Sequence, residues 1–247
     1  HELRSPLTAM AGELDVALRH PRAADSYLET IVVVRRRLAA LTELAGNLML
    51  LARVQEGGDE IALREVAIAP VVDEAVARWA EAALARRITF ATRALADVSV
   101  YGDPGLVSRV IDNVVANAVH YNRDGGAVTV SARLTEPAEG QWAPTLVTID
   151  VTDEGTGIQA ADHERIFERF FRVDESRHRH TGGSGLGLAI CREVVQALGG
   201  SIHVAASSAA GTTIAITLPG HDGDHPPEPI VMHAAPSALS VQERPTS

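Results

Sequence analysis

Two glycine-rich segments constrain most strongly what this chain of 247 residues can fold into. The first, Asp153-Glu154-Gly155-Thr156-Gly157-Ile158, follows an apolar stretch that predicts a strand over 145–152. The second, Gly182-Gly183-Ser184-Gly185-Leu186-Gly187-Leu188, leads into a predicted helix that ends at Gly199-Gly200. Glycine lets the backbone approach a ligand closely, and free N–H groups at a helix N-terminus suit phosphates. Together they predict a nucleotide pocket in which Asp153 accepts a hydrogen bond from an exocyclic amine such as adenine N6.

Other interpretations of these glycine segments carry less weight. Gly155-x-Gly157-x-x-Ala160 also fits a dinucleotide-binding fingerprint, but two carboxylates would repel a pyrophosphate and no βαβ pattern surrounds the segment. The second segment, taken alone, could be a flexible turn before a helix. The chain contains no lysine, which excludes a P-loop ATPase because that loop needs a lysine at the phosphates.

A pair of asparagines, Asn113 and Asn117, predicts a metal site. The two residues are four apart and share one face of a helix predicted to begin at Asp103-Pro104. Neutral oxygen ligands suit a Mg²⁺ ion that phosphates already bridge. The alternative is a pair of capping or core amides.

The segment between these motifs predicts a mobile lid over 172–184. Its cations are available to neutralise phosphates, although a solvated loop would also explain them; they are Arg172, Arg177 and Arg179, of which the first two are favoured. Three of the four phenylalanines precede or begin the lid and could clamp it against the domain: Phe167, Phe170 and Phe171.

Apolar residues at spacings of three and four predict two helices at the start of the chain. The first covers 1–20 and is broken at His20-Pro21. The second runs to about Gln55 with a heptad-like seam from Ile31 to Ala52. Such a hairpin buries only one side, so we expect a second copy to complete a four-helix bundle. The alternative is a hairpin that packs on the rest of its own chain.

The remaining pattern predicts an α+β sandwich, with a mixed sheet and helices on one face. Gly57-Gly58 indicates a hinge. The predicted strands cover 61–66, 87–92, 98–101, 127–134, 145–152, 201–206 and 212–218, and the other predicted helices cover 70–86 and 162–169. The expected division is a helical hairpin over 1–56, a hinge over 57–60, a nucleotide-binding domain over 61–219 and a disordered tail over 220–247.

Composition narrows the classes of function. The net charge of -10 argues against broad nucleic-acid binding. A single cysteine, Cys191, excludes an internal disulfide framework and suits a reducing compartment. No apolar run approaches the length of a membrane span, so we expect no membrane contact within these residues.

The motifs, in this order, resemble the conserved boxes of two-component sensor histidine kinases. His1-Glu2-Leu3-Arg4-Ser5-Pro6-Leu7 resembles the H-box, and the stretch from Asn113 to Tyr121 resembles the N-box. Four further segments resemble the remaining boxes of the family: Asp153–Ile158 (G1), Ile166–Phe170 (F), Gly183–Leu188 (G2) and Gly211-Thr212-Thr213 (the last glycine box). The resemblance covers about residues 1–219.

The resemblance implies a dimeric hairpin that carries a phosphoacceptor, followed by a Bergerat-type ATP-binding domain of the kind shared with gyrase, Hsp90 and MutL. It implies ATP and Mg²⁺ as cofactors, and a response regulator receiver domain as the partner whose aspartate takes the phosphoryl group. His1 would be the phosphoacceptor, with Glu2 orienting a ring proton and Ser5 orienting water for dephosphorylation of that partner. The implied nucleotide-binding residues are Asn113, Asn117, His120, Tyr121, Asp153, Gly155, Gly157, Ile158, Phe170, Arg172, Arg177, Gly183, Gly185, Leu186, Gly187, Leu188 and Thr212.

Two positions depart from the family pattern. His120 stands where the family often has lysine or arginine, so the contact with phosphate would weaken when the imidazole is neutral. Ser5 stands where threonine or asparagine is frequent. The chain does not begin with methionine, and we expect a cytoplasmic piece of a membrane-anchored bacterial sensor. Two alternatives stay open: an ATPase or protein-serine kinase of the same superfamily, and a binding module without catalysis.

Overall fold

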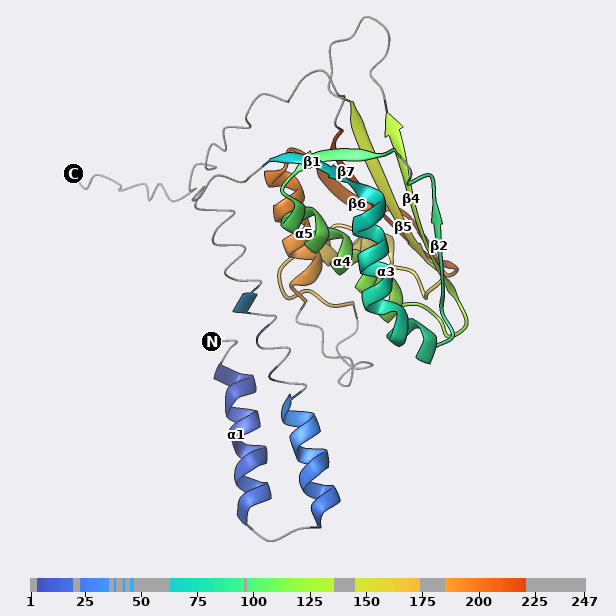
Figure 1. Cartoon of the computed structure of the whole chain (residues 1–247). Helices are drawn as coiled ribbons and strands as arrows, with labels where there is room; N and C mark the ends of the chain where they lie inside the picture. Colours follow the sequence, from blue (N-terminus) through green and yellow to red (C-terminus); the bar gives the residue numbers. More distant parts are fainter. Residues whose placement is uncertain are drawn as a thin grey trace, which may run out of the picture.

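The computed structural model describes residues 4–19, 23–35, 63–95, 97–135, 145–173 and 185–220, together with residues 38, 42, 45 and 46. Helix α1 (Arg4–Arg19) lies beside the helical residues 24–35, and the two run antiparallel (Figure 1). The first predicted helix and the start of the second are therefore present. Most of the predicted continuation to Gln55, and the hinge at 57–60, lie outside the described residues.

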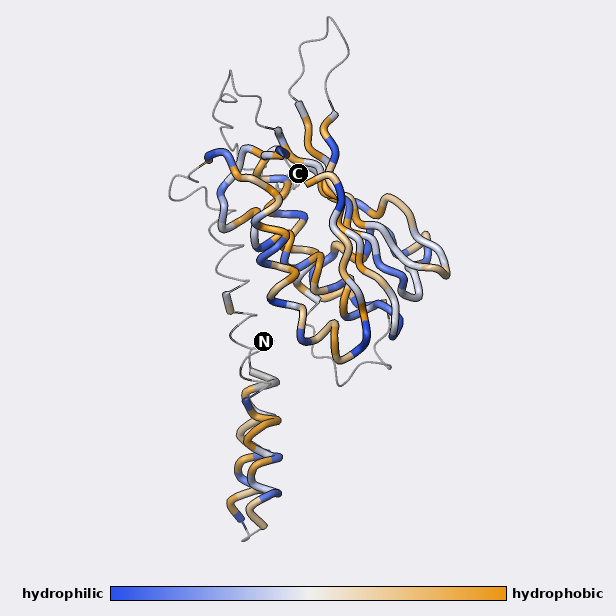
Figure 2. The backbone as a smooth tube through the Cα atoms, turned by 45° about the vertical axis from the view of Figure 1, so that its right-hand side comes forward, coloured by the Kyte–Doolittle hydropathy of each residue, from blue (hydrophilic) through white to orange (hydrophobic). Residues whose placement is uncertain are grey.

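The two N-terminal helices expose many of their apolar side chains. Met10 and Ala17 are buried, but Leu18 is 78% exposed and Ile31 is 57% exposed. Figure 2 shows hydrophobic residues spread along both helices. A helix normally buries such residues, so these side chains form an apolar surface that the described residues of this chain leave uncovered.

The rest of the described chain forms an α+β structure with a mixed five-stranded sheet. The sheet order is β2-β4-β5-β7-β6, in which β2 pairs parallel with β4 and all other pairs are antiparallel. Its strands are β2 (Thr89–Arg93), β4 (Ala127–Thr135), β5 (Leu146–Asp153), β6 (Ser201–Ser208) and β7 (Gly211–Pro219). A separate antiparallel pair joins β1 (Arg64–Ala67) to β3 (Ser99–Gly102).

Three helices cover one face of this sheet, the arrangement predicted from the mixture of strands and helices along the sequence (Figure 1). They are α3 (Ile68–Ala85), α4 (Pro104–His120) and α5 (Gly187–Ala197). Along β4, the alternate residues Val128, Val130 and Ala132 are buried, which is the period expected of a strand with one covered face. Helix α4 begins as predicted, because the Asp103 side chain accepts a hydrogen bond from the Leu106 N–H and Pro104 occupies the first turn.

One predicted helix is wrong. Residues 162–169 form no α-helix; the chain makes two short 3-10 turns instead, η1 (Ala160–Asp162) and η2 (Arg165–Phe167). The side chain of Phe167 is buried, and its carbonyl accepts a hydrogen bond of 3.0 Å from Arg192 on α5. Contacts with α5 therefore hold this segment in tight turns. The other predicted elements that lie wholly within the described residues differ from the observed ones only at their ends. Among the described residues, no helix has the length and apolar character needed to cross a membrane.

Candidate functional site

Asp153 is the last residue of β5, at the end of the sheet where α4 also ends. One carboxylate oxygen, Oδ1, accepts hydrogen bonds from the Gly155 N–H at 2.8 Å and the Thr212 N–H at 3.3 Å. Burial raises the pKa of Asp153, and these two backbone N–H groups oppose the rise. The side chain is therefore held in one orientation by the loop that follows β5 and by the start of β7.

The glycines after Asp153 permit close contacts between backbone segments. A Cβ at Gly155 would lie 2.1 Å from the Tyr121 carbonyl oxygen, and one at Gly157 would lie 1.9 Å from the Ser208 carbonyl oxygen. Gly157 also has φ of +73°, a conformation that other residues adopt at a cost. The loop thus packs directly between the end of α4 and the turn that joins β6 to β7.

Two polar residues that sequence reasoning missed fix this loop. The Ile158 N–H donates to Ser207 Oγ at 2.7 Å. Ser207 Oγ in turn lies 3.1 Å from Oγ1 of the buried residue Thr212. On the other side, Asn122 Oδ1 accepts from the Glu154 N–H at 3.3 Å. The contacts of the Ile158 and Glu154 N–H groups join residues more than 30 positions apart, so no local pattern could reveal them.

Arg86, also missed, holds the C-terminal end of α4. Its guanidinium donates to the carbonyls of Val119 at 2.6 Å, His120 at 2.9 Å and Asn122 at 2.6 Å. Unsatisfied carbonyls at a helix end carry partial negative charge, and a cation there satisfies and neutralises them. Arg86 therefore stabilises the part of α4 that carries His120.

The two asparagines of α4 have different surroundings. Asn113 is 9% exposed, and its Oδ1 is among the atoms nearest to Gly187, the first residue of α5. Within the described residues, its Nδ2 has no hydrogen-bond partner. Asn117, one turn later, is half-buried. Asn113 thus lies between two helices, whereas Asn117 is the more accessible of the pair.

Cys191 on α5 is the other group close to Asn113. Its side chain is fully buried, and its Sγ donates to the Val110 carbonyl at 3.7 Å. Burial raises the pKa of the Cys191 thiol to about 12, although the polar side chain of the nearby Asn113 opposes the rise. A thiol with this pKa is neutral and unreactive, so Cys191 serves packing between α4 and α5.

The remaining predicted residues surround the two ends of the predicted lid. The N–H of Phe170 donates to the Gly185 carbonyl at 3.0 Å, which closes the base of the segment 171–184. Phe170 is 43% exposed, whereas Leu186 is fully buried and begins the turn into α5. Arg172 and Leu188 are half-buried, and Tyr121 is exposed. Of the predicted aromatic clamp, Phe167 is buried and Phe171 packs against the core, but Phe170 is not covered.

Some predicted residues cannot be placed. His1, Glu2, Arg177 and Gly183 lie outside the described residues, as do the side chain of Ser5 and the tail from 221 onward. Within the described part of the chain, no group of three or more His, Cys, Asp or Glu residues could hold a metal ion.

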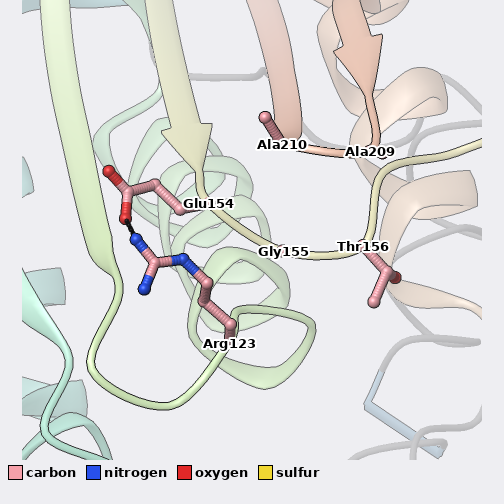
Figure 3. Close-up of a pocket in the computed structure, with 6 residues that line it drawn as sticks. All are labelled: Arg123, Glu154, Gly155, Thr156, Ala209 and Ala210. Carbon is pink, nitrogen blue, oxygen red and sulfur yellow. Dashed lines mark hydrogen bonds and ion pairs between the residues drawn. The ribbon is translucent and has the colours of Figure 1, made fainter.

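A hollow of about 350 Å³ borders the loop after β5. It is lined by Arg123, Glu154, Gly155, Thr156, Ala209 and Ala210. Arg123 and Glu154 form an ion pair at one side of it, opposite Thr156 and the β6–β7 turn (Figure 3). Asp153 and the asparagines of α4 are not part of this lining, so the hollow lies beside the candidate site.

Comparison with known proteins identifies the family. Residues 102–222 match the family described as histidine kinase-, DNA gyrase B- and HSP90-like ATPase. The sensor-like histidine kinase SenX3 of Mycolicibacterium smegmatis is 37% identical over 222 residues, which cover 89% of this chain and 55% of SenX3. A solved structure of the mycobacterial sensor histidine kinase MprB is 32% identical and has a TM-score of 0.52, covering 65% of this chain and 99% of MprB's. The chain belongs to the sensor histidine kinase family.

This membership confirms the resemblance inferred from the motifs. β5 pairs antiparallel with both of its neighbours, so the glycines after it do not belong to a dinucleotide-binding βαβ unit. The histidine kinase ThkA, solved in complex with the response regulator protein TrrA, shares the fold at 21% identity and a TM-score of 0.63, over 90% of this chain and 59% of that one. The chain spans about half of the length of the curated relatives that it matches first.

Proposed function

We propose that this chain is an ATP-dependent protein-histidine kinase of two-component signalling. ATP would phosphorylate His1, and the phosphoryl group would pass to an aspartate of a response regulator receiver domain. The observation that carries the proposal is the fixed Asp153 carboxylate, held by two backbone N–H groups at the end of β5 within the segment that matches the ATPase family. A half-buried, oriented carboxylate beside glycine loops suits the recognition of an adenine amine.

Successive parts of the chain would have different roles. Residues 1–56 would form the dimerisation and phosphotransfer hairpin, 57–60 the hinge, 61–219 the catalytic domain and 220–247 a disordered tail. The exposed apolar side chains of α1 and of residues 24–35 support a homodimer, because a second copy would cover them. Rotation of the catalytic domain about the hinge would bring the γ-phosphate of a bound nucleotide to His1.

Within the catalytic domain, we assign the nucleotide to the loop-and-helix end of the sheet. Asp153 would bind the adenine base, and Asn117 would hold Mg²⁺ together with the phosphates. Asn113, which is buried, would assist Asn117 in holding the ion. The Mg²⁺ ion would neutralise charge on the phosphates. The loop from Gly183 to Gly187, with Arg172, Arg177 and His120, would bind the triphosphate chain, and Tyr121, Ile158, Phe170, Leu188 and Thr212 would complete the walls.

The proposed reaction is an in-line transfer to a nitrogen. The unprotonated ring nitrogen of His1 attacks the γ-phosphorus, a P–N bond forms, and the bond to the bridging oxygen breaks to release ADP. Glu2 would orient or accept the proton of the other ring nitrogen, which makes the imidazole a better nucleophile. The remainder of the catalysis would be positioning and charge neutralisation. Ser5 would orient a water molecule when the partner regulator is dephosphorylated.

A labelling experiment tests this proposal. The chain is fused in helical phase behind a short dimeric coiled coil, so that His1 lies within a continuous helix, and is incubated with Mg²⁺ and γ-labelled ATP. We expect label that is acid-labile, base-stable and absent from the matched His1→Gln variant. Acid-stable label would indicate a serine kinase, and ATP hydrolysis without label would indicate an ATPase. Absence of ATP binding would indicate a non-catalytic module.

A further inference from the structure

Trp79 is the feature of this structure that neither the family motifs nor the proposed function uses. It lies on α3, is half-buried and packs against the core. Its indole N–H donates to Asp112 Oδ1 on α4 at 3.0 Å, and the same carboxylate oxygen accepts from Arg78 at 2.7 Å. The side chain of Asp112 is only 15% exposed. The indole N–H is therefore held by a carboxylate that is largely shielded from solvent.

The other contact of this indole is His120, the last residue of α4. The two rings are 5.2 Å apart between centroids and inclined at 73°, an edge-to-face arrangement that aromatic pairs favour. His120 is exposed, and it lies one turn after Asn117 on the helix. The contact thus links a core-anchored ring to a side chain next to the proposed phosphate site.

We propose that Trp79 is a positioning residue that holds the His120 imidazole toward the phosphates of the nucleotide; this inference rests on the proposed function. Histidine at this position is shorter than the lysine or arginine frequent in the family, so it has less reach with which to find a phosphate. An imidazole that the indole holds in one orientation loses less conformational freedom when a ligand binds. The contacts that join Asp112 to Trp79 and Trp79 to His120 would therefore let the short His120 side chain act as an effective phosphate ligand.

A double-mutant cycle on nucleotide affinity tests the proposal. ATP binding with Mg²⁺ is measured for the unmodified chain, Trp79→Leu, His120→Ala and the double variant, with adenosine as a probe that lacks phosphates. We expect Trp79→Leu to weaken ATP binding about two- to tenfold, the effect of one aromatic pair. Adenosine binding should not change, and Trp79→Leu should have no further effect once His120 is alanine.

Two further variants keep the experiment decisive. Trp79→Phe retains a ring against His120 but loses the hydrogen bond to Asp112, and should lie between the unmodified chain and Trp79→Leu. Arg78→Gln disturbs the same carboxylate while leaving the indole in place, and should bind ATP normally. The proposal is overturned if Trp79→Leu weakens ATP and adenosine equally, or weakens ATP by the same factor with alanine at position 120. An unmodified chain that binds no ATP would instead overturn the proposed function.

Discussion

Alanine at Gly157 should destabilise the catalytic domain considerably more than alanine at Gly125, although the two glycines share one backbone conformation. Their φ angles are +73° and +74°. The left-handed conformation costs a residue with a side chain about 1–2 kcal/mol, and this cost applies equally to both variants. What differs is the space around the new Cβ.

The magnitude of the difference follows from the contacts. A Cβ at Gly125 meets nothing within 4 Å, whereas one at Gly157 would lie 1.9 Å from the Ser208 carbonyl oxygen and 2.7 Å from its carbon. Both atoms are backbone, so the loop or the β6–β7 turn must move. Overpacking of this kind costs about 1–3 kcal/mol. Gly157→Ala should therefore lose about 2–5 kcal/mol in total, against about 1–2 kcal/mol for Gly125→Ala.

Thermal unfolding followed by circular dichroism measures this difference. For a domain of this size, each kcal/mol lowers Tm by about 2–4 °C, so Gly157→Ala should melt about 2–12 °C below Gly125→Ala. The same movement would lengthen the hydrogen bond from the Ile158 N–H to Ser207, so ATP affinity should fall in Gly157→Ala alone. Equal melting temperatures for the two variants would refute the close approach of the loop to Ser208.

Three further predictions follow from single groups. Burial raises the pKa of Asp153, so the native state binds its proton more tightly than the unfolded chain. Urea unfolding should therefore show that the unmodified chain loses stability relative to Asp153→Asn as pH rises from the ordinary carboxyl range through the raised pKa. The same pH dependence of stability in both proteins would contradict this. Cys191, with a pKa of about 12, should react with a thiol reagent at pH 8 at least about a hundredfold faster in urea than in the native state. Arg192→Ala should lower the free energy of unfolding by about 1–2 kcal/mol through loss of the hydrogen bond to the Phe167 carbonyl, whereas Arg169→Ala, which removes an exposed ion pair, should cost less than about 1 kcal/mol.

Local sequence signals predicted much of the fold and the place of Asp153 within it. The cap at Asp103 and the proline after it correctly marked the start of α4, and the apolar stretch over 145–152 marked β5. The position of Asp153 at a strand end followed from the apolar run before it. These features depend on residues close in sequence, so the amino-acid pattern reports them directly.

The contacts that the sequence did not reveal are those between distant segments. The hydrogen bond from the Ile158 N–H to Ser207 and the cap that Arg86 places on α4 depend on which elements become neighbours. The predicted helix over 162–169 failed for the same reason, because contacts of Phe167 with α5 outweigh local helical preference. Trp79 illustrates the same point, since nothing in its own helix indicates that it meets His120.

If Asp153 binds the adenine base of ATP as proposed, two nucleotides that differ only in the exocyclic amine should bind this chain with different affinities. Calorimetric titration with Mg²⁺ would compare ATP with purine riboside triphosphate, which keeps the ring, sugar and phosphates but lacks the exocyclic amine. We expect ATP to bind the unmodified chain about tenfold or more tightly, since a hydrogen bond to a charged group contributes about 1.5–3 kcal/mol, and this preference to disappear in Asp153→Ala. Equal binding of the two nucleotides by the unmodified chain would show that Asp153 does not bind the adenine amine.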